Sequence, residues 1–174
     1  MIPTVDIKDT FETERLVLTK VTLTDASFIR ELVNTPGWIK FIGERNVKTI
    51  EDAEKYIQKL LLNPSITYLV VKLKLVNTPL GIISFIKRDY LDHYDIGFAF
   101  LPQYTNKGYA FEAAKEVLSY ALNDLKMPAI VATTLHENAN SIHLLEKLGL
   151  HFEKKIVAEK EELLLYSTGS NGSL

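Results

Sequence analysis

Residues 101–114 read LPQYTNKGYAFEAA, a pattern that predicts a strand turning through a short loop into a helix. Residues 94–100 before it are aromatic and apolar, which favours a buried strand. After the loop, apolar side chains recur at the i, i+3, i+4, i+7 spacing of an amphipathic helix. They are Ala110, Ala113, Ala114, Val117, Leu118, Ala121 and Leu122. We therefore expect a buried strand that leads into a helix with one buried face.

The start of that helix is a candidate anion site. The first N–H groups of a helix have no partner within it, and the helix dipole adds positive charge there. Gly108 lets a ligand approach the backbone closely, and Lys107 supplies a cation. A phosphate or pyrophosphate fits such a site, although many strand-loop-helix units bind nothing. The loop matches neither the P-loop nor the dinucleotide fingerprint, because it has a single glycine.

Residues 128–149 form a second informative stretch. Residues 128–135 are apolar enough for a buried strand, and Asn138 after them is a typical helix N-cap. Gly149 is placed to end that helix in a left-handed conformation. The residues expected to face the core are Ile142, Leu145 and Leu148.

These segments resemble the GCN5-related N-acetyltransferase (GNAT) superfamily, in particular its ribosomal-protein N-acetyltransferase branch. The resemblance is carried by LPQYxxKGYAxEA at 101–113, NxxSxxLLEKLG at 138–149, ERLVL at 14–18 and TIEDAEKYI at 49–57. It implies a single α/β domain over residues 1–174, with its core at about 13–168 and a flexible tail at 169–174. The implied sheet is mixed, mostly antiparallel and splayed in the middle, with helices on both faces.

The resemblance implies acetyl transfer from acetyl-CoA to a primary amine, on a protein N-terminus or a small molecule, by direct attack in a ternary complex. The pantetheine arm is expected along the strand, at Phe98, Ala99, Phe100 and Leu101. The pyrophosphate is expected on Thr105, Asn106, Lys107, Gly108, Tyr109 and Ala110, with Asn138 and Ser141 completing the cofactor site. Pro102 cannot donate to a strand ladder, which agrees with a sheet that opens there.

Three positions depart from the family pattern. Thr105 stands where relatives carry Gln or Arg, and Asn106 where this branch often has glycine, although asparagine tolerates a left-handed backbone. Leu145 stands where many relatives have a tyrosine acid. These departures keep a second function open, namely a non-catalytic acyl-CoA-binding sensor or regulatory domain.

Acetyl transfer needs a group that accepts the amine proton and one that protonates the leaving thiolate. The resemblance implies Ser141 as the acid; its alternative role is a helix residue bonding the backbone. Asp95 is the candidate base, and its alternative role is an ion pair with a lysine or arginine. His93 is a second candidate base. Positioning of the reactants could also carry much of the rate without a base.

The acceptor pocket is harder to predict from the sequence. Trp38, Ile39 and Phe41 follow a turn signal and either line this pocket or pack the loop on the sheet. Lys72, Lys74, Lys87 and Arg88 alternate with or follow apolar runs, so we expect them on solvated strand faces.

Composition excludes several classes of function. Hydrophobic residues make up 47% of 174 residues, enough for one domain with a sizeable core. The net charge of −2 gives no electrostatic case for nucleic acid or an anionic membrane. There is no cysteine, and the four histidines lack metal-ligand spacing, so we expect no metal site. Without a signal-like or membrane-length segment, we expect a cytoplasmic monomer or homodimer.

The predicted strands lie at residues 15–21, 67–75, 80–88, 94–101, 130–135, 151–157 and 162–168. The predicted helices lie at residues 25–33, 50–62, 107–122 and 139–148, with Thr24 and Thr49 as caps of the first two. Residues 76–79 are expected to turn a hairpin.

Overall fold

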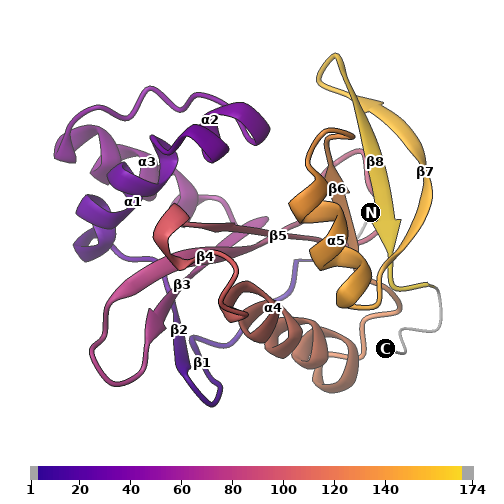
Figure 1. Cartoon of the computed structure of the whole chain (residues 1–174), viewed down its shortest axis with the longest axis horizontal. Coiled ribbons are helices and arrows are strands. Elements are labelled where there is room, and N and C mark those ends of the chain that lie inside the picture. The colour runs from indigo at the N-terminus through magenta and orange to yellow at the C-terminus, as the bar shows by residue number, and fades with distance from the viewer. Residues whose placement is uncertain (1–3, 170–174) are drawn as a thin grey trace.

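A single mixed sheet runs through the protein, as the computed structural model of residues 4–169 shows (Figure 1). Its strands are β1 (Thr10–Glu12), β2 (Leu16–Lys20), β3 (Ile66–Leu73), β4 (Pro79–Ile86), β5 (Asp95–Phe100), β6 (Val131–Thr134), β7 (His151–Ala158) and β8 (Glu161–Ser167). Their order is β1-β2-β3-β4-β5-β6-β8-β7. β5 and β6 run parallel, and the other neighbours are antiparallel. The predicted mixed, mostly antiparallel sheet is confirmed.

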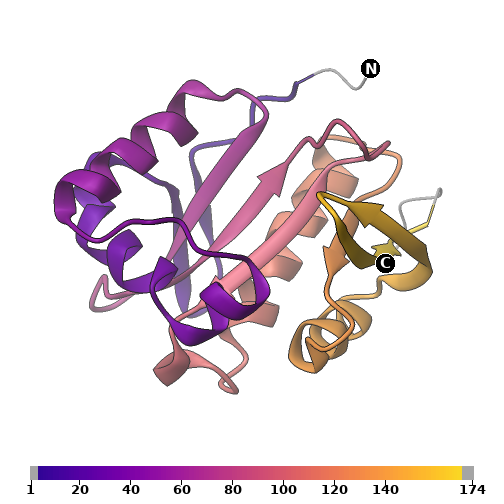
Figure 2. The same ribbon diagram turned by 90° about the horizontal axis from the view of Figure 1, so that it is seen from above.

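Helices cover both faces of the sheet, as predicted (Figures 1 and 2). They are α1 (Ala26–Val33), α2 (Pro36–Phe41), α3 (Ile50–Leu62), α4 (Tyr109–Ser119) and α5 (Ala139–Lys147). α4 and α5 pack into one hydrophobic core, with Val117, Leu118 and Leu145 among its buried residues. α1, α2 and α3 pack into a second core on the opposite face. Strands β3 and β4 are buried on both sides, which explains their nearly continuous apolar sequence.

Helix ends follow the capping chemistry that the sequence predicts. Thr49 accepts a hydrogen bond from the Asp52 N–H at 3.0 Å and Asp52 caps Thr49 in return, so a capping box starts α3. At the C-terminal end of α5, Gly149 adopts a φ of 94°. Its N–H donates to the Glu146 carbonyl, and the Leu150 N–H donates to the Leu145 carbonyl. These two bonds are those of a Schellman motif, so Gly149 is the predicted C′ residue.

Some elements differ from the prediction. β1 was not expected because it has only three residues, of which Phe11 alone is buried. α2 was expected as loop, although Thr35 caps it and Pro36 occupies its first position. Thr24 does not cap α1, because Thr22 and Asp25 form a capping box around the 3₁₀ turn Leu23–Asp25. Of the predicted tail, residues 170–174 lie outside the described part of the chain.

The helix predicted at residues 107–122 ends differently from the prediction. After Ser119 the chain widens into a π turn, Tyr120–Asp124, in which the Leu125 N–H donates to the Tyr120 carbonyl at 3.0 Å. Lys126 then takes a left-handed φ of 57°, and Pro128 comes two residues later. The buried stripe of this helix still continues through Ala121 and Leu122, so the predicted core face is retained.

Candidate active site

The sheet opens between β5 and β6. These parallel strands pair at Asp95 and Val131, where the Val131 N–H donates to the Tyr94 carbonyl at 2.9 Å. The register between them contains no further pair within residues 4–169, while β6 stays paired with β8 up to Thr134. The gap therefore runs from a closed end at Asp95 to an open end at Phe100; we call it the splay.

One edge of β5 offers free backbone groups to the splay. The Leu101 N–H donates to the Leu80 carbonyl at 2.9 Å, on the β4 side. Because alternate residues of a strand direct their N–H and C=O groups to opposite edges, those of Phe98 and Phe100 point away from β4. An amide-bearing ligand can satisfy them. Ala99 and Leu101, also predicted to contact the cofactor, have side chains that pack toward the core beneath α1–α3.

The loop at the open end of the splay leads into α4, and the first N–H groups of that helix have no hydrogen-bond partner within it. Gly108 is the N-cap and has a φ of 81°, and Asn106 adopts a φ of 60°, so the left-handed turn expected there is present. The first bond of the helix joins the Glu112 N–H to the Gly108 carbonyl at 3.0 Å. The preceding N–H groups lack an intrahelical partner; they belong to Tyr109, Ala110 and Phe111. We refer to residues 105–110 as the anion loop.

Side-chain contacts hold the anion loop in place. Thr105 Oγ1 donates to the Pro102 carbonyl at 2.8 Å. Glu112 accepts hydrogen bonds from the Thr13 hydroxyl and, at 3.0 Å, from the Arg15 N–H. Burial alone would raise the pKa of Glu112, but these hydrogen bonds lower it, so the carboxylate stays charged. Glu112 thus attaches the ERLVL segment at 14–18 to the start of α4. The sequence alone suggested no structural role for this segment.

Asp95 lies at the closed end of the splay and is 4% exposed. Its Oδ2 accepts a hydrogen bond from Arg88 Nε at 2.5 Å. Burial raises the pKa of Asp95 to about 6, although Arg88 and hydrogen bonds from Thr133 of β6 favour its charged form. The ion pair considered as the alternative role of Asp95 is therefore present. Such a carboxylate is ionised at neutral pH and can also accept a proton.

Arg88 and His93, both close to Asp95 in the sequence, lie in different surroundings. Arg88 is not on a solvated strand face; its side chain is 32% exposed because it turns inward to pair with Asp95. His93 lies in the bend before β5, is partly buried and makes no hydrogen bond or ion pair with any described residue. The structure therefore brings Asp95, not His93, into a polar cluster.

Ser141 and Asn138 lie at the start of α5. Asn138 Oδ1 accepts a hydrogen bond from the Ser141 N–H at 3.2 Å, which confirms Asn138 as the N-cap. The Ser141 hydroxyl makes no hydrogen bond to residues 4–169, so the structure lacks the backbone bond considered as its alternative role. Leu145 is 1% exposed and packs in the core. No contact joins Ser141 to Asp95. α5 starts after the C-terminal end of β6, whereas Asp95 lies at the closed end of the splay, where β5 and β6 pair.

A row of hydroxyl groups crosses the sheet on the side covered by α1–α3. Tyr68 of β3, Ser84 of β4 and Gly97 of β5 lie in register. The Tyr68 and Tyr56 hydroxyls are 3.1 Å apart, and burial raises the pKa of Tyr68. A Cβ on Gly97 would lie 2.5 Å from Ser84 Oγ, so a side chain at this position would force the Ser84 hydroxyl to move. Sequence reasoning missed Tyr68 and Ser84; the available signal was that Ser84 is the one polar residue in the apolar strand β4.

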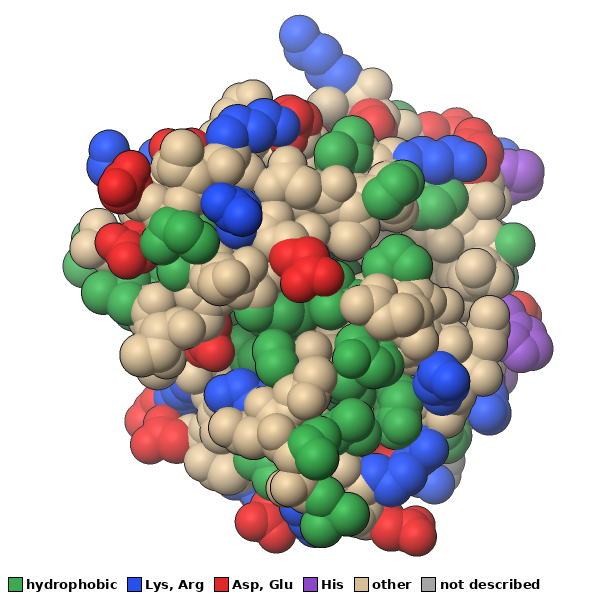
Figure 3. Space-filling model, turned by 60° about the vertical axis from the view of Figure 1, so that its left-hand side comes forward, with side chains coloured by type: hydrophobic (Ala, Val, Ile, Leu, Met, Phe, Trp, Pro, Cys, Tyr) green, Lys and Arg blue, Asp and Glu red, His purple; other side chains and the backbone are tan. Residues whose placement is uncertain are grey.

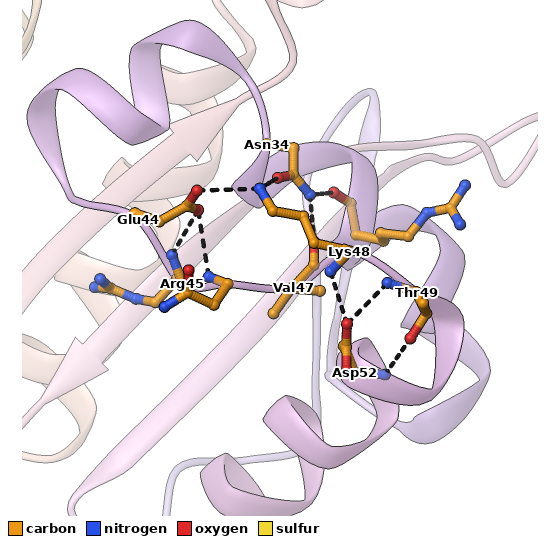
Figure 4. Close-up of polar contacts among 9 residues, drawn as sticks. Asn34, Glu44, Arg45, Val47, Lys48, Thr49 and Asp52 are labelled. Atoms are coloured by element: carbon orange, nitrogen blue, oxygen red, sulfur yellow. Dashed lines mark hydrogen bonds and ion pairs between the residues drawn. The ribbon is translucent and has the colours of Figure 1, made fainter.

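The segment between α2 and α3, residues 42–49, is held by a polar network (Figure 4). Glu44 accepts hydrogen bonds from the Arg45 N–H at 3.0 Å and from Lys48 Nζ at 3.0 Å. The Arg45 side chain extends away from this network, and its guanidinium lies 5.9 Å from the centre of the Trp38 ring. The network therefore holds the segment whose Val47 packs into the core beneath α1–α3.

Trp38 packs in the core beneath α1–α3, where it is 3% exposed. Its indole N–H has no hydrogen-bond partner within the described chain. Ile39 is 42% exposed and Phe41 partly buried. Among the three residues considered for the acceptor pocket, Trp38 therefore has the alternative role, which is to pack this segment on the sheet.

Charge is not concentrated on the face that Figure 3 shows. Acidic and basic side chains are interspersed there, and hydrophobic side chains gather across its centre and lower part (Figure 3). Within residues 4–169, no three His, Cys, Asp or Glu side chains come together as metal ligands. No helix in this same part of the chain is both long and apolar enough to cross a membrane.

Comparison with known proteins identifies the family. The family described as an acetyltransferase (GNAT) domain matches residues 15–151, most of the chain. This protein belongs to the GNAT acetyltransferase family. The expected superfamily is thereby confirmed, and the match includes the splay, the anion loop and α5.

Individual relatives agree with this assignment. An uncharacterized N-acetyltransferase of Bacillus subtilis, YnaD, is 31% identical over 153 residues, 86% of this chain and 89% of its own. A GNAT-family acetyltransferase from Bacillus anthracis is 30% identical, with a TM-score of 0.76 over 91% of this chain and 96% of its own. The ribosomal-protein-S5-alanine acetyltransferase of Vibrio fischeri, at 20% identity, shares the fold with a TM-score of 0.78, over 94% and 98% of the two chains.

Proposed function

We propose that this GNAT acetyltransferase transfers the acetyl group of acetyl-CoA to a primary amine, on a protein N-terminus or a small molecule. The observation that carries the proposal is the open edge of β5, which ends at the anion loop and the N-terminus of α4. A ligand with amides at one end and phosphates at the other matches this arrangement. Acetyl-CoA has both, and supplies an activated acetyl thioester.

The residues of this chain suggest how each part is held. The backbone of Phe98 and Phe100 would pair with the pantetheine amides, and the N–H groups at the start of α4 would bind the pyrophosphate. The acceptor amine would approach along the hydroxyl row of Tyr68 and Ser84, because Asp95 and Gly97 present the same face of β5. Both reactants could then be bound at once, as direct attack requires.

Asp95 would accept the proton that the amine loses, directly or through a water. As the C–N bond forms and the C–S bond breaks, the leaving thiolate would accept a hydrogen bond from the Ser141 hydroxyl and take up its proton, while the serine regains a proton from solvent water. The buried Leu145 offers no proton, so the role that a tyrosine has at this position in many relatives is assigned here to Ser141.

Replacing Ser141 with alanine is expected to lower kcat about 100-fold with little change in KM, because negative charge on sulfur develops only in the transition state. Steady-state kinetics on an accepted amine measure both constants. Ser27→Ala, on the exposed side of α1, is the matched control and should match the parent. A kcat for Ser141→Ala within a few-fold of the parent would show that positioning, not acid catalysis, carries this step.

Acetyl-CoA is expected to stabilise the folded protein. Ligand at ~100 times its dissociation constant adds about 2.7 kcal/mol to the free energy of unfolding, which raises Tm by about 5–10 °C for a chain of this size. Thermal melts with and without millimolar acetyl-CoA measure the shift. An unchanged Tm would argue strongly against a CoA site.

The deciding experiment is a coupled assay of free CoA release over a panel of amines that includes peptides with free N-termini, polyamines and aminoglycosides. Release that depends on one class of amine supports the transferase and identifies its acceptor. Binding of acetyl-CoA without release for any amine would instead favour the sensor domain.

A further inference from the structure

The guanidinium of Arg15 lies against the anion loop, although Arg15 is more than ninety positions away in the chain. Its Nε donates to Glu112 Oε1 at 2.7 Å, and its Nη1 donates to the Lys107 carbonyl at 3.1 Å. Its plane also lies over the Tyr109 ring, 4.4 Å from the ring centre. Three contacts therefore fix this side chain against the start of α4.

The remaining nitrogen of that guanidinium, Nη2, faces Gly108. It lies 3.3 Å from the position that a Cβ on Gly108 would occupy, and no described residue accepts a hydrogen bond from it. The Arg15 side chain is 41% exposed, so a ligand can reach this edge. A guanidinium with one free edge beside unpaired helix N–H groups is well suited to an anionic oxygen.

The anion loop has little side-chain charge of its own. The Thr105 hydroxyl is engaged with Pro102, and Lys107 is the one basic residue among residues 105–110. We propose that Arg15 is a phosphate-binding residue of this site: Nη1 holds the Lys107 carbonyl, and Nη2 donates to a phosphate oxygen of CoA. The inference rests on the proposed function, because it needs CoA at the anion loop.

The test measures dissociation constants by calorimetry for CoA, 3′-dephospho-CoA and pantetheine. Arg15→Gln is expected to weaken CoA binding about 10-fold to 100-fold, the usual loss for a charge-assisted hydrogen bond, and to leave pantetheine unchanged. Arg15→Lys should retain part of the affinity, since it keeps the charge. Arg30→Gln is the matched control, an exposed arginine on α1 across the sheet from α4.

Two further variants separate contact with the phosphate from support of the loop. Glu112→Gln weakens the support but keeps the Arg15 charge, so it should bind CoA more tightly than Arg15→Gln does. Adding Thr105→Arg to Arg15→Gln returns a guanidinium to the loop without the Glu112 contact, and should recover most of the CoA affinity. Equal losses in Arg15→Gln and Glu112→Gln, with no recovery in the double variant, would overturn the inference.

The choice of ligands identifies which phosphate is bound. A loss in Arg15→Gln that persists with 3′-dephospho-CoA assigns the contact to the pyrophosphate, and a loss that disappears assigns it to the 3′-phosphate; both support the inference. An Arg15→Gln variant that binds CoA like the parent overturns it. Failure of the parent to bind CoA is a different result, which overturns the proposed function itself.

Discussion

Replacing Gly108 with glutamate is expected to abolish acetyl-CoA binding while the protein stays folded. Gly108 has a φ of 81°, where a residue with a side chain is strained by about 1–2 kcal/mol. The new carboxylate would also stand where the phosphate is proposed to bind and would compete for Arg15. Like charges brought together cost several kcal/mol, so affinity should fall at least about 100-fold. Calorimetry with acetyl-CoA measures the loss, and circular dichroism checks the fold.

Gly37→Glu provides the matched control. Gly37 is exposed in the first turn of α2, and a Cβ there would meet no heavy atom within 4 Å. This variant makes the same chemical change at a helix start and should bind acetyl-CoA as the parent does. If Gly108→Glu retained parental affinity, the phosphate would have to bind somewhere other than the anion loop.

Asp95→Asn is expected to lower kcat by about 10²–10⁴-fold, the usual contribution of a general base. In the parent, kcat/KM should fall as pH drops below about 6, because protonation removes the base. The variant should be slow at every pH and lack this inflection. Asp92→Asn, an exposed carboxylate in the bend before β5, is the control. An unaltered pH profile in Asp95→Asn would exclude Asp95 and make His93 or bulk water the better candidate.

The same carboxyl group should affect stability with a defined sign. Burial raises the pKa of Asp95 from 3.8 to about 6, so between these values the folded state binds a proton that the unfolded state has lost. Its contribution to the free energy of unfolding is therefore full below about pH 4 and is lost as pH rises to about 6. Asp95→Asn should remove this slope, which denaturant titrations at several pH values would show.

Local signals explain why most helices and strands could be predicted. α3 is predicted correctly because Thr49, a typical N-cap residue, directly precedes its first residue. α5 was located by its cap and its C′ glycine, Asn138 and Gly149. In each case the residues that decide the boundary are close in sequence.

The contacts that shape the candidate site are not local, and they could not be predicted. Arg15 reaches Glu112 because β2 starts at the same end of the sheet as α4, a consequence of strand order. Arg88 was expected on a solvated strand face. The sequence does not reveal that the chain bends between Arg88 and Asp95 and so brings the two side chains together. Tyr68 and Ser84 meet through strand register, which no single strand specifies.

The open edge of β5 also bears on aggregation. An unpaired strand edge is a template on which another chain can add a strand, and soluble proteins protect such edges. Here the edge is recessed, because β6 closes one end of the splay and β8 and β7 lie beyond it in the sheet. Pro102, two residues after the end of β5, has no N–H to donate and so prevents the ladder from being extended. A second polypeptide strand could reach this edge only by entering between β5 and β6, so the arrangement of the sheet itself protects the unpaired edge from self-association.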